Sequence, residues 1–233
     1  MDGATVETKE VALAAGASKT VSFSLVKDKA GTYQVGIGGL TSSLKVKAKL
    51  VVKEVELKYD DGEARAFGYS FGFSGAIGYI VDFSPPATPF TIKKIRVAGA
   101  IYSQGAGFEK ISFDLQILDK NGTVLHSTTY PCTKFPVNAI VNTWTEFEVP
   151  DIKVTDKFYV DVLVSYPTGF STTPLVGVDD SVVNQHSNFA TRTAEGKVVI
   201  LAQWLFSGQE WWADKSKVNW MIRVVGTGMM PES

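Results

Sequence analysis

Acidic residues gather at two points of the chain where they could hold a metal ion. Asp60, Asp61 and Glu63 surround Gly62 in one short run, and Asp179-Asp180 form a second acidic pair. Carboxylates close together in a loop suit Ca²⁺, which takes six to eight oxygen ligands. The same residues also suit a solvated turn, where Asp and Gly satisfy the backbone. The sequence therefore predicts a structural calcium site at Asp60, Asp61 and Glu63 or, as the alternative, an ordinary turn; the same alternatives apply to Asp179-Asp180.

Tryptophans crowd the C-terminal part of the chain. Trp211 and Trp212 follow a polar run that contains Gln209 and Glu210. Adjacent residues of an extended segment point to opposite sides, so at least one of the two indoles should be exposed. Aromatic faces stack on sugar rings, and we therefore predict a ligand-binding surface at Trp211 and Trp212 with Gln209 and Glu210. The alternative is a hydrophobic plug over the end of a sandwich. Trp220 stands in an apolar run and is predicted to be core.

His186-Ser187 near Asp179 and Asp180 is the one arrangement that resembles a hydrolase site. A catalytic triad needs Ser, His and acid to converge from separate positions, and here Ser directly follows His, which aims the two side chains apart. We therefore predict no catalytic residue and no enzyme activity, and we place catalysis below binding.

The residues that must position these groups are organised as short strands. In the second part of the chain β-type runs recur from Tyr79 to Val225, separated by Gly and Pro. Asp119-Lys120-Asn121-Gly122 is predicted to be a hairpin turn with Asn-Gly at its centre. About eight strands are expected: Tyr79–Phe83, Thr91–Val97, Ile111–Leu118, Thr123–Thr129, Thr143–Val149, Phe158–Ser165, Val198–Phe206 and Val218–Val225. Their spacing favours an antiparallel sandwich or jelly roll without a convincing helix.

The first fifty residues show the same rhythm. Four runs are expected to be strands: Val6–Ala15, Thr20–Val26, Thr32–Ile37 and Ser43–Val51. The turns between them leave no room for a helical crossover, so the pairing should be antiparallel. Lys45–Lys58 alternates charged and apolar residues and is predicted to be one long strand that joins two modules. We place the modules at residues 1–53 and 54–233.

Composition narrows the class of protein. The chain has 233 residues, 45% of them hydrophobic, and a net charge of −1, which argues against a nucleic-acid partner. No stretch reaches the roughly 20 apolar residues of a membrane helix, so no membrane insertion is expected. Cys132 is the only cysteine, which excludes an internal disulfide. The start, Met1-Asp2-Gly3, lacks the basic and apolar regions of a signal peptide. Because the first strand is expected at once, we interpret the chain as a piece of a longer exported protein.

Two segments resemble known families. The run Val6–Phe23, continued by Ala30–Val35 and Gly39-Leu40, resembles the second half of an adhesion-related, immunoglobulin-like repeat of the CARDB type. Such repeats are spacers or adhesion units of bacterial and archaeal surface proteins. The rest is similar to accessory β-sandwich domains of secreted bacterial proteins, through motifs scattered along the module: Tyr59–Ala64, Val81–Pro86, Gly177–Asp180, His186-Ser187 and Asn219–Arg223. The resemblance implies a targeting role and supplies no catalytic residues.

Together these observations predict an all-β chain, with a partial immunoglobulin-like sandwich followed by a jelly-roll-like sandwich. The predicted function is a non-catalytic secreted or cell-surface module that acts as spacer and recognition unit, with a glycan or another surface protein as partner. One alternative is a carbohydrate-binding module of a larger enzyme, and another is a carboxylate-based glycan hydrolase. Apart from structural calcium no cofactor is expected. The incomplete first module should expose apolar strands, which predicts a homodimer through that module.

Overall fold

The computed structural model describes most of the chain, in two compact units. The described residues are 7–24, 27, 29–37, 39–67, 75–101, 110–137, 143–166, 174–181, 186–193, 197–201 and 219–232. One unit comprises Met1–Val51 with Met230–Ser233, and the other comprises Val52–Met229.

The protein is all-β. Its strands are β1 (Gly31–Ile37), β2 (Leu40–Val46), β3 (Leu50–Leu57), β4 (Ala66–Phe67), β5 (Gly75–Phe83), β6 (Phe90–Ile101), β7 (Ser112–Asp119), β8 (Val124–Pro131), β9 (Trp144–Val154), β10 (Phe158–Tyr166), β11 (Pro174–Asp179), β12 (Ser187–Arg192), β13 (Val198–Leu201), β14 (Asn219–Trp220) and β15 (Ile222–Pro231). The described residues also include a short 3₁₀ turn, η2 (Cys132–Lys134). Within the ranges given above, no helix is long and apolar enough to cross a membrane.

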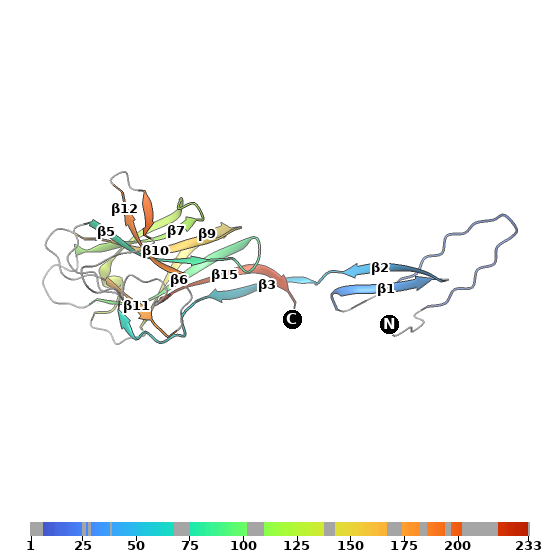
Figure 1. Ribbon diagram of the computed structural model, residues 1–233, viewed down its shortest axis with the longest axis horizontal. Coiled ribbons are helices and arrows are strands. Elements are labelled where there is room, and N and C mark those ends of the chain that lie inside the picture. The colour runs from blue at the N-terminus through green and yellow to red at the C-terminus, as the bar shows by residue number, and fades with distance from the viewer. Residues whose placement is uncertain are drawn as a thin grey trace. The chain divides into compact units, whose positions relative to one another are not determined.

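The larger unit is an antiparallel β-sandwich of two sheets. The first sheet has six strands in the order β13-β12-β5-β10-β7-β8. The second has the order β14-β11-β6-β15-β3, with β9 paired to β6 and β4 to β11. Strand β10 pairs antiparallel with β5 and β7, and β6 pairs antiparallel with β15 and β9. Figure 1 shows β5, β7 and β10 in one layer and β3, β6 and β15 in the other.

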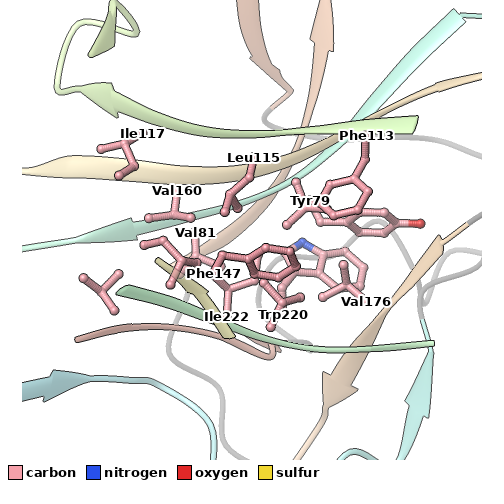
Figure 2. Packing of buried hydrophobic residues seen from close by; sticks show 14 of the residues in the cluster. Tyr79, Val81, Phe113, Leu115, Ile117, Phe147, Val160, Val176, Trp220 and Ile222 are labelled. Atoms are coloured by element: carbon pink, nitrogen blue, oxygen red, sulfur yellow. The ribbon is translucent and has the colours of Figure 1, made fainter. Parts of the chain in front are cut away.

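The core lies between the two sheets because side chains on each strand alternate between the inner and outer faces. On β5, Tyr79, Val81 and Phe83 point inward and are at most 1% exposed. Figure 2 shows Tyr79 and Val81 packed with side chains that come from several other strands. The Trp220 indole meets the Tyr79 ring edge-on at 5.0 Å between centroids, so the prediction that Trp220 is core is confirmed.

The smaller unit contains one described ladder, between β1 and β2 (Figure 1). One face of this ribbon is apolar, with Tyr33 opposite Leu44 and Ile37 opposite Leu40, and its other face is polar. Leu40 is 80% exposed and Ile37 53%. The apolar face is therefore largely open to solvent.

The strands predicted at Val6–Ala15 and Thr20–Val26 are wrong, because the described part of these ranges contains no strand. Residues 7–24 contain a turn, in which Gly16 has φ +78° and the Ala17 N–H donates to the Ala14 carbonyl at 3.0 Å, and no strand. The two arms of this turn meet instead through Lys9, whose Nζ donates to the Ser22 carbonyl. Among the described residues of this unit no third strand or second sheet pairs with these arms, so a ladder there would be marginal.

The second module follows the predicted strands more closely, and the antiparallel sandwich is confirmed. The Asn-Gly hairpin is also confirmed: Gly122 has φ +82° and Asp119 Oδ1 accepts from the N–H groups of Asn121 and Thr123, both at 2.8 Å. The single strand predicted over Lys45–Lys58 is wrong, because β2 ends at Val46 and β3 begins at Leu50.

The estimate of about eight strands was too low. It missed β4, β11 and β12. Every residue of β11 is buried, so this strand has no alternating pattern, and it also begins with proline and contains Gly177. A strand covered on both faces carries no period-2 signal that the sequence could reveal.

Candidate functional site

Four of the scattered motifs meet at one place in the larger unit. The loop after β3 carries Tyr59 to Arg65, and its Asp61 N–H donates to Asp179 Oδ2, at the end of β11, at 2.9 Å. The Arg65 N–H donates to the Val178 carbonyl at 2.8 Å. Asp179 in turn pairs with Asn219 on β14. Residues far apart in the chain thus form one cluster, which we call the motif cluster: Tyr59–Arg65, Asp179–Ser181, His186-Ser187 and Asn219–Arg223.

Arg65 organises the acidic part of this cluster. Its two terminal nitrogens lie 2.7 Å from Asp61 Oδ2 and 2.7 Å from Asp179 Oδ1. Ser181 Oγ lies within hydrogen-bond distance of the same two carboxylates, 3.0 Å from Asp61 Oδ2 and 2.6 Å from Asp179 Oδ1. The hydrogen bond from Arg65, followed by that from the Glu63 N–H, holds the pKa of Asp61 far below its usual range. Asp179 has no exposed side-chain surface, so its charge is balanced inside the cluster.

Asp60 belongs to a different network. Arg223 Nε donates to Asp60 Oδ1 at 3.1 Å, and Arg223 Nη1 lies 3.2 Å from Glu56 Oε2. The same guanidinium lies over the Trp144 ring, 4.2 Å from its centroid, a distance typical of a cation–π contact. Arg223 is therefore held from three sides.

The three residues of the predicted calcium site do not converge on one point. Asp60 pairs with Arg223, Asp61 pairs with Arg65, and the Glu63 side chain is 74% exposed. Throughout the described ranges, no group of three or more His, Cys, Asp or Glu side chains is arranged to hold a metal ion. The arginines occupy the carboxylates that calcium would need, which favours the alternative of an ordinary turn, and the calcium site predicted from the sequence is untested.

A stack of aromatic rings leads from the core to the surface beside this network. Phe158 stacks on Phe83 at 5.7 Å, Phe83 on Tyr59 at 5.3 Å, and Tyr59 on His186 at 3.8 Å with an interplanar angle of 13°. Phe158 and Phe83 are fully buried, whereas the His186 side chain is 36% exposed. His186 is thus the outermost ring of a stack that is anchored in the core.

Asp82 fixes the orientation of this outer ring. His186 Nδ1 lies 3.0 Å from Asp82 Oδ2, and Lys157 Nζ lies 3.2 Å from the same oxygen. A carboxylate can only accept, so Nδ1 donates and Nε2 is left as an acceptor when the imidazole is neutral. Burial, and then the charge of Asp82, raises the pKa of Tyr59. The Asp82 side chain is 10% exposed, so His186 and Lys157 form the accessible part of this group.

The sequence did not identify Asp82, Arg65 or Arg223 as site residues. A signal was available for Asp82, because a carboxylate inside the apolar strand β5 is unusual. No comparable signal singles out the two arginines. Arg223 depends on a carboxylate 163 positions away in the chain, and Arg65 depends on one 114 positions away as well as on the nearby Asp61.

His186 and Ser187 point apart, as the sequence suggested. Ser187 is 1% exposed, and its Oγ accepts a hydrogen bond from the Trp220 N–H at 2.9 Å. The acid next to His186 is Asp82, from β5, and the neighbouring serine hydroxyl is turned into the core. This arrangement gives an oriented histidine without an adjacent serine nucleophile among the residues described.

The predicted sugar-binding residues Trp211, Trp212, Gln209 and Glu210 lie outside the described residues. Their prediction therefore stands as the sequence left it. No family model matches the chain, and a search of curated proteins finds no match.

Proposed function

We propose that the chain is a non-catalytic spacer and recognition module of a secreted or cell-surface protein, and that it contacts its ligand through His186, Tyr59 and Lys157. The observation that carries the proposal is the half-exposed Tyr59–His186 stack, with its outer ring oriented by Asp82. Binding residues placed on loops of a rigid scaffold are the usual design of β-sandwich recognition modules.

The chemistry of this surface fits a glycan. The outer face of a ring stack contacts the apolar face of a sugar, while His186 Nε2 accepts from a hydroxyl and Lys157 donates to one. The stack is rigid because Phe83 and Phe158 anchor it, so little conformational entropy is lost on binding. A surface protein that presents hydroxyls or a carboxylate to the same groups is the second candidate partner.

The hydrolase alternative has weaker geometric support. A carboxylate-based hydrolase needs an acid and a base that both face the substrate. Asp114 and Asp161 lie on one face of the six-stranded sheet, but Asp161 has no exposed surface. Binding therefore accounts for the exposed groups of this unit better than hydrolysis does.

A glycan array with the full chain tests the proposal. We expect at least one glycan to bind, and His186→Ala and Lys157→Ala to weaken that binding about tenfold, equivalent to about 1.4 kcal/mol. His126→Ala and Lys120→Ala are matched controls, because these side chains lie on β8 and in the β7–β8 turn and take no part in the stack.

The same array separates the competing explanations. Loss of binding in Trp211→Ala or Trp212→Ala, with His186→Ala unaffected, would move the ligand site to the tryptophan pair. Turnover of a bound oligosaccharide would favour the hydrolase. Absence of binding to every glycan by the unaltered chain would reject glycan recognition.

A further inference from the structure

Asp161 is the most unusual ionisable group of the larger unit. It lies on β10, the strand between β5 and β7, and it has no exposed surface. In the part of the chain that the structure describes, neither of its carboxyl oxygens has a hydrogen-bond partner. An ionised carboxylate buried without a partner is strongly unfavourable, and such a group binds a proton instead.

The sheet leaves space for this carboxyl group at Gly78 on β5. A Cβ atom at Gly78 would lie 2.3 Å from Asp161 Oδ1 and 2.7 Å from Oδ2. The carboxyl group therefore rests directly against the β5 backbone. Glycine is the one residue that permits this approach without displacing Asp161.

The charged groups that act on Asp161 come from the neighbouring strands. Arg192 extends from β12 and donates to Asp114 Oδ2 on β7 at 2.9 Å. In the strand order, β5 and β10 lie between β12 and β7, so this ion pair spans the two strands that carry Gly78 and Asp161. On β5 the ionisable residue of the same face is Asp82, which His186 and Lys157 already contact.

Two further buried atoms on this face could be satisfied by Asp161, one by its neutral form and the other by its ionised form. Gln116 lies opposite Asp161 across the β7–β10 ladder, and its Oε1 has no donor among the residues described. A neutral carboxyl group supplies a donor on this face, whereas an ionised one supplies none. Within the same described residues, Arg192 Nε is buried and has no acceptor, which an ionised Asp161 would provide.

We infer that Asp161 is a proton-binding site built into the six-stranded sheet. Its carboxyl group is neutral while Arg192 pairs with Asp114. Once ionised, Asp161 competes with Asp114 for Arg192. Burial raises the pKa of Asp161 to about 7, with Arg192 opposing and Asp114 adding to the effect. The change from the Arg192–Asp114 pair to competition between Asp114 and Asp161 for Arg192 thus falls near neutral pH. It does not depend on the proposed ligand.

The direction of the pH effect follows from proton binding. The pKa of an aspartate in an unfolded chain is about 3.9. Between that value and about 7 the folded chain holds one proton more at Asp161 than the unfolded chain does. Stability contributed by this site is therefore present at low pH, decreases as pH rises through this window, and is lost above it.

The test compares the unfolding of the full chain and its Asp161→Asn variant across pH 4 to 8.5. The amide keeps the shape and cannot ionise. We expect the ratio of the wild-type folding constant to the Asp161→Asn folding constant to fall about tenfold per pH unit up to about pH 7, as linkage for one proton requires. Asp151→Asn, which removes an exposed carboxylate paired with Lys93, should leave a pH-independent ratio in this range.

Two further variants test the competition for Arg192. Asp114→Asn releases Arg192 and removes a negative charge, so Asp161 should titrate at lower pH. Arg192→Gln removes the positive charge, so Asp161 should titrate at higher pH. The carbon resonance of the Asp161 carboxyl group reports this titration directly in the unaltered protein, even where a variant does not fold. A constant Asp161→Asn ratio, or a carboxyl resonance that titrates near pH 4, would overturn the inference.

Discussion

Asp60 and Asp61 are neighbours in the chain, yet their carboxylates belong to different ion-pair networks. Asp60 faces Arg223 and is buried, whereas Asp61 faces Arg65 and Ser181 nearer the surface. The two carboxylates therefore meet different arginines, although the residues lie side by side in the loop after β3. Acidic residues that are adjacent in a sequence therefore need not direct their carboxylates at the same metal ion.

Calcium should have little effect on stability at this position. Because Arg65 and Arg223 already balance Asp61 and Asp60, we expect the same melting temperature in excess Ca²⁺ and in chelator. A bound ion would stabilise the fold by about 2.7 kcal/mol at a hundredfold excess over its dissociation constant, which a thermal melt detects. NaCl at matched ionic strength is the control. A rise with Ca²⁺ alone would mean that the ion displaces an arginine, as the sequence prediction requires.

At the scale of the strands, the contact between β5 and β10 shows how two positions constrain each other. Gly78 and Asp161 lie on neighbouring strands of the six-stranded sheet, and the side chain of one fills the space left by the other. No local pattern in the sequence pairs Gly78 with Asp161 or shows that the group approaching the glycine is a carboxyl.

Gly78→Ala should destabilise the larger unit by roughly 1–3 kcal/mol, the usual cost of overpacking a rigid interior. The new methyl carbon would lie 2.3 Å from Asp161 Oδ1, too close for two atoms that are not bonded, and the backbone of both strands is fixed by the ladder. Urea unfolding measures the change. In the background of Asp161→Ala the same substitution should cost little, because the obstructing carboxyl is gone. Equal costs in both backgrounds would show that the two positions do not interact.

At the scale of the whole molecule, the smaller unit leaves apolar surface uncovered. The β1–β2 ribbon presents Tyr33, Ile37, Leu40 and Leu44 on one face, and Leu40 is 80% exposed. A two-stranded ribbon is marginally stable alone, and an open apolar face favours association. These features keep the homodimer predicted from the sequence as our expectation for this unit.

Light scattering should therefore give twice the mass of one chain. Leu40→Lys places a charge on the apolar face and should shift the protein towards the monomer. Thr41→Lys places the same charge on the polar face of the same strand and should leave the mass unchanged. A monomeric unaltered chain, or equal masses for both variants at all concentrations, would contradict association through this face.

Local signals determined which parts of this protein became strands and turns. Apolar alternation predicted the strands of the sandwich, and Asn121-Gly122 predicted the hairpin, because both depend on residues that are adjacent in the chain. The same signals failed at residues 7–24, where alternation has no sheet to pack on, and at β11, where burial on both faces removes alternation. Only the tertiary structure decided that Arg65 and Arg223 neutralise the acidic loop, that Asp82 orients His186, and that Gly78 accommodates Asp161. Those contacts join residues that strand pairing brings together. The free energy of such a pairing depends on the side chains of both strands, so a local stretch of sequence, which contains only one of them, cannot predict it.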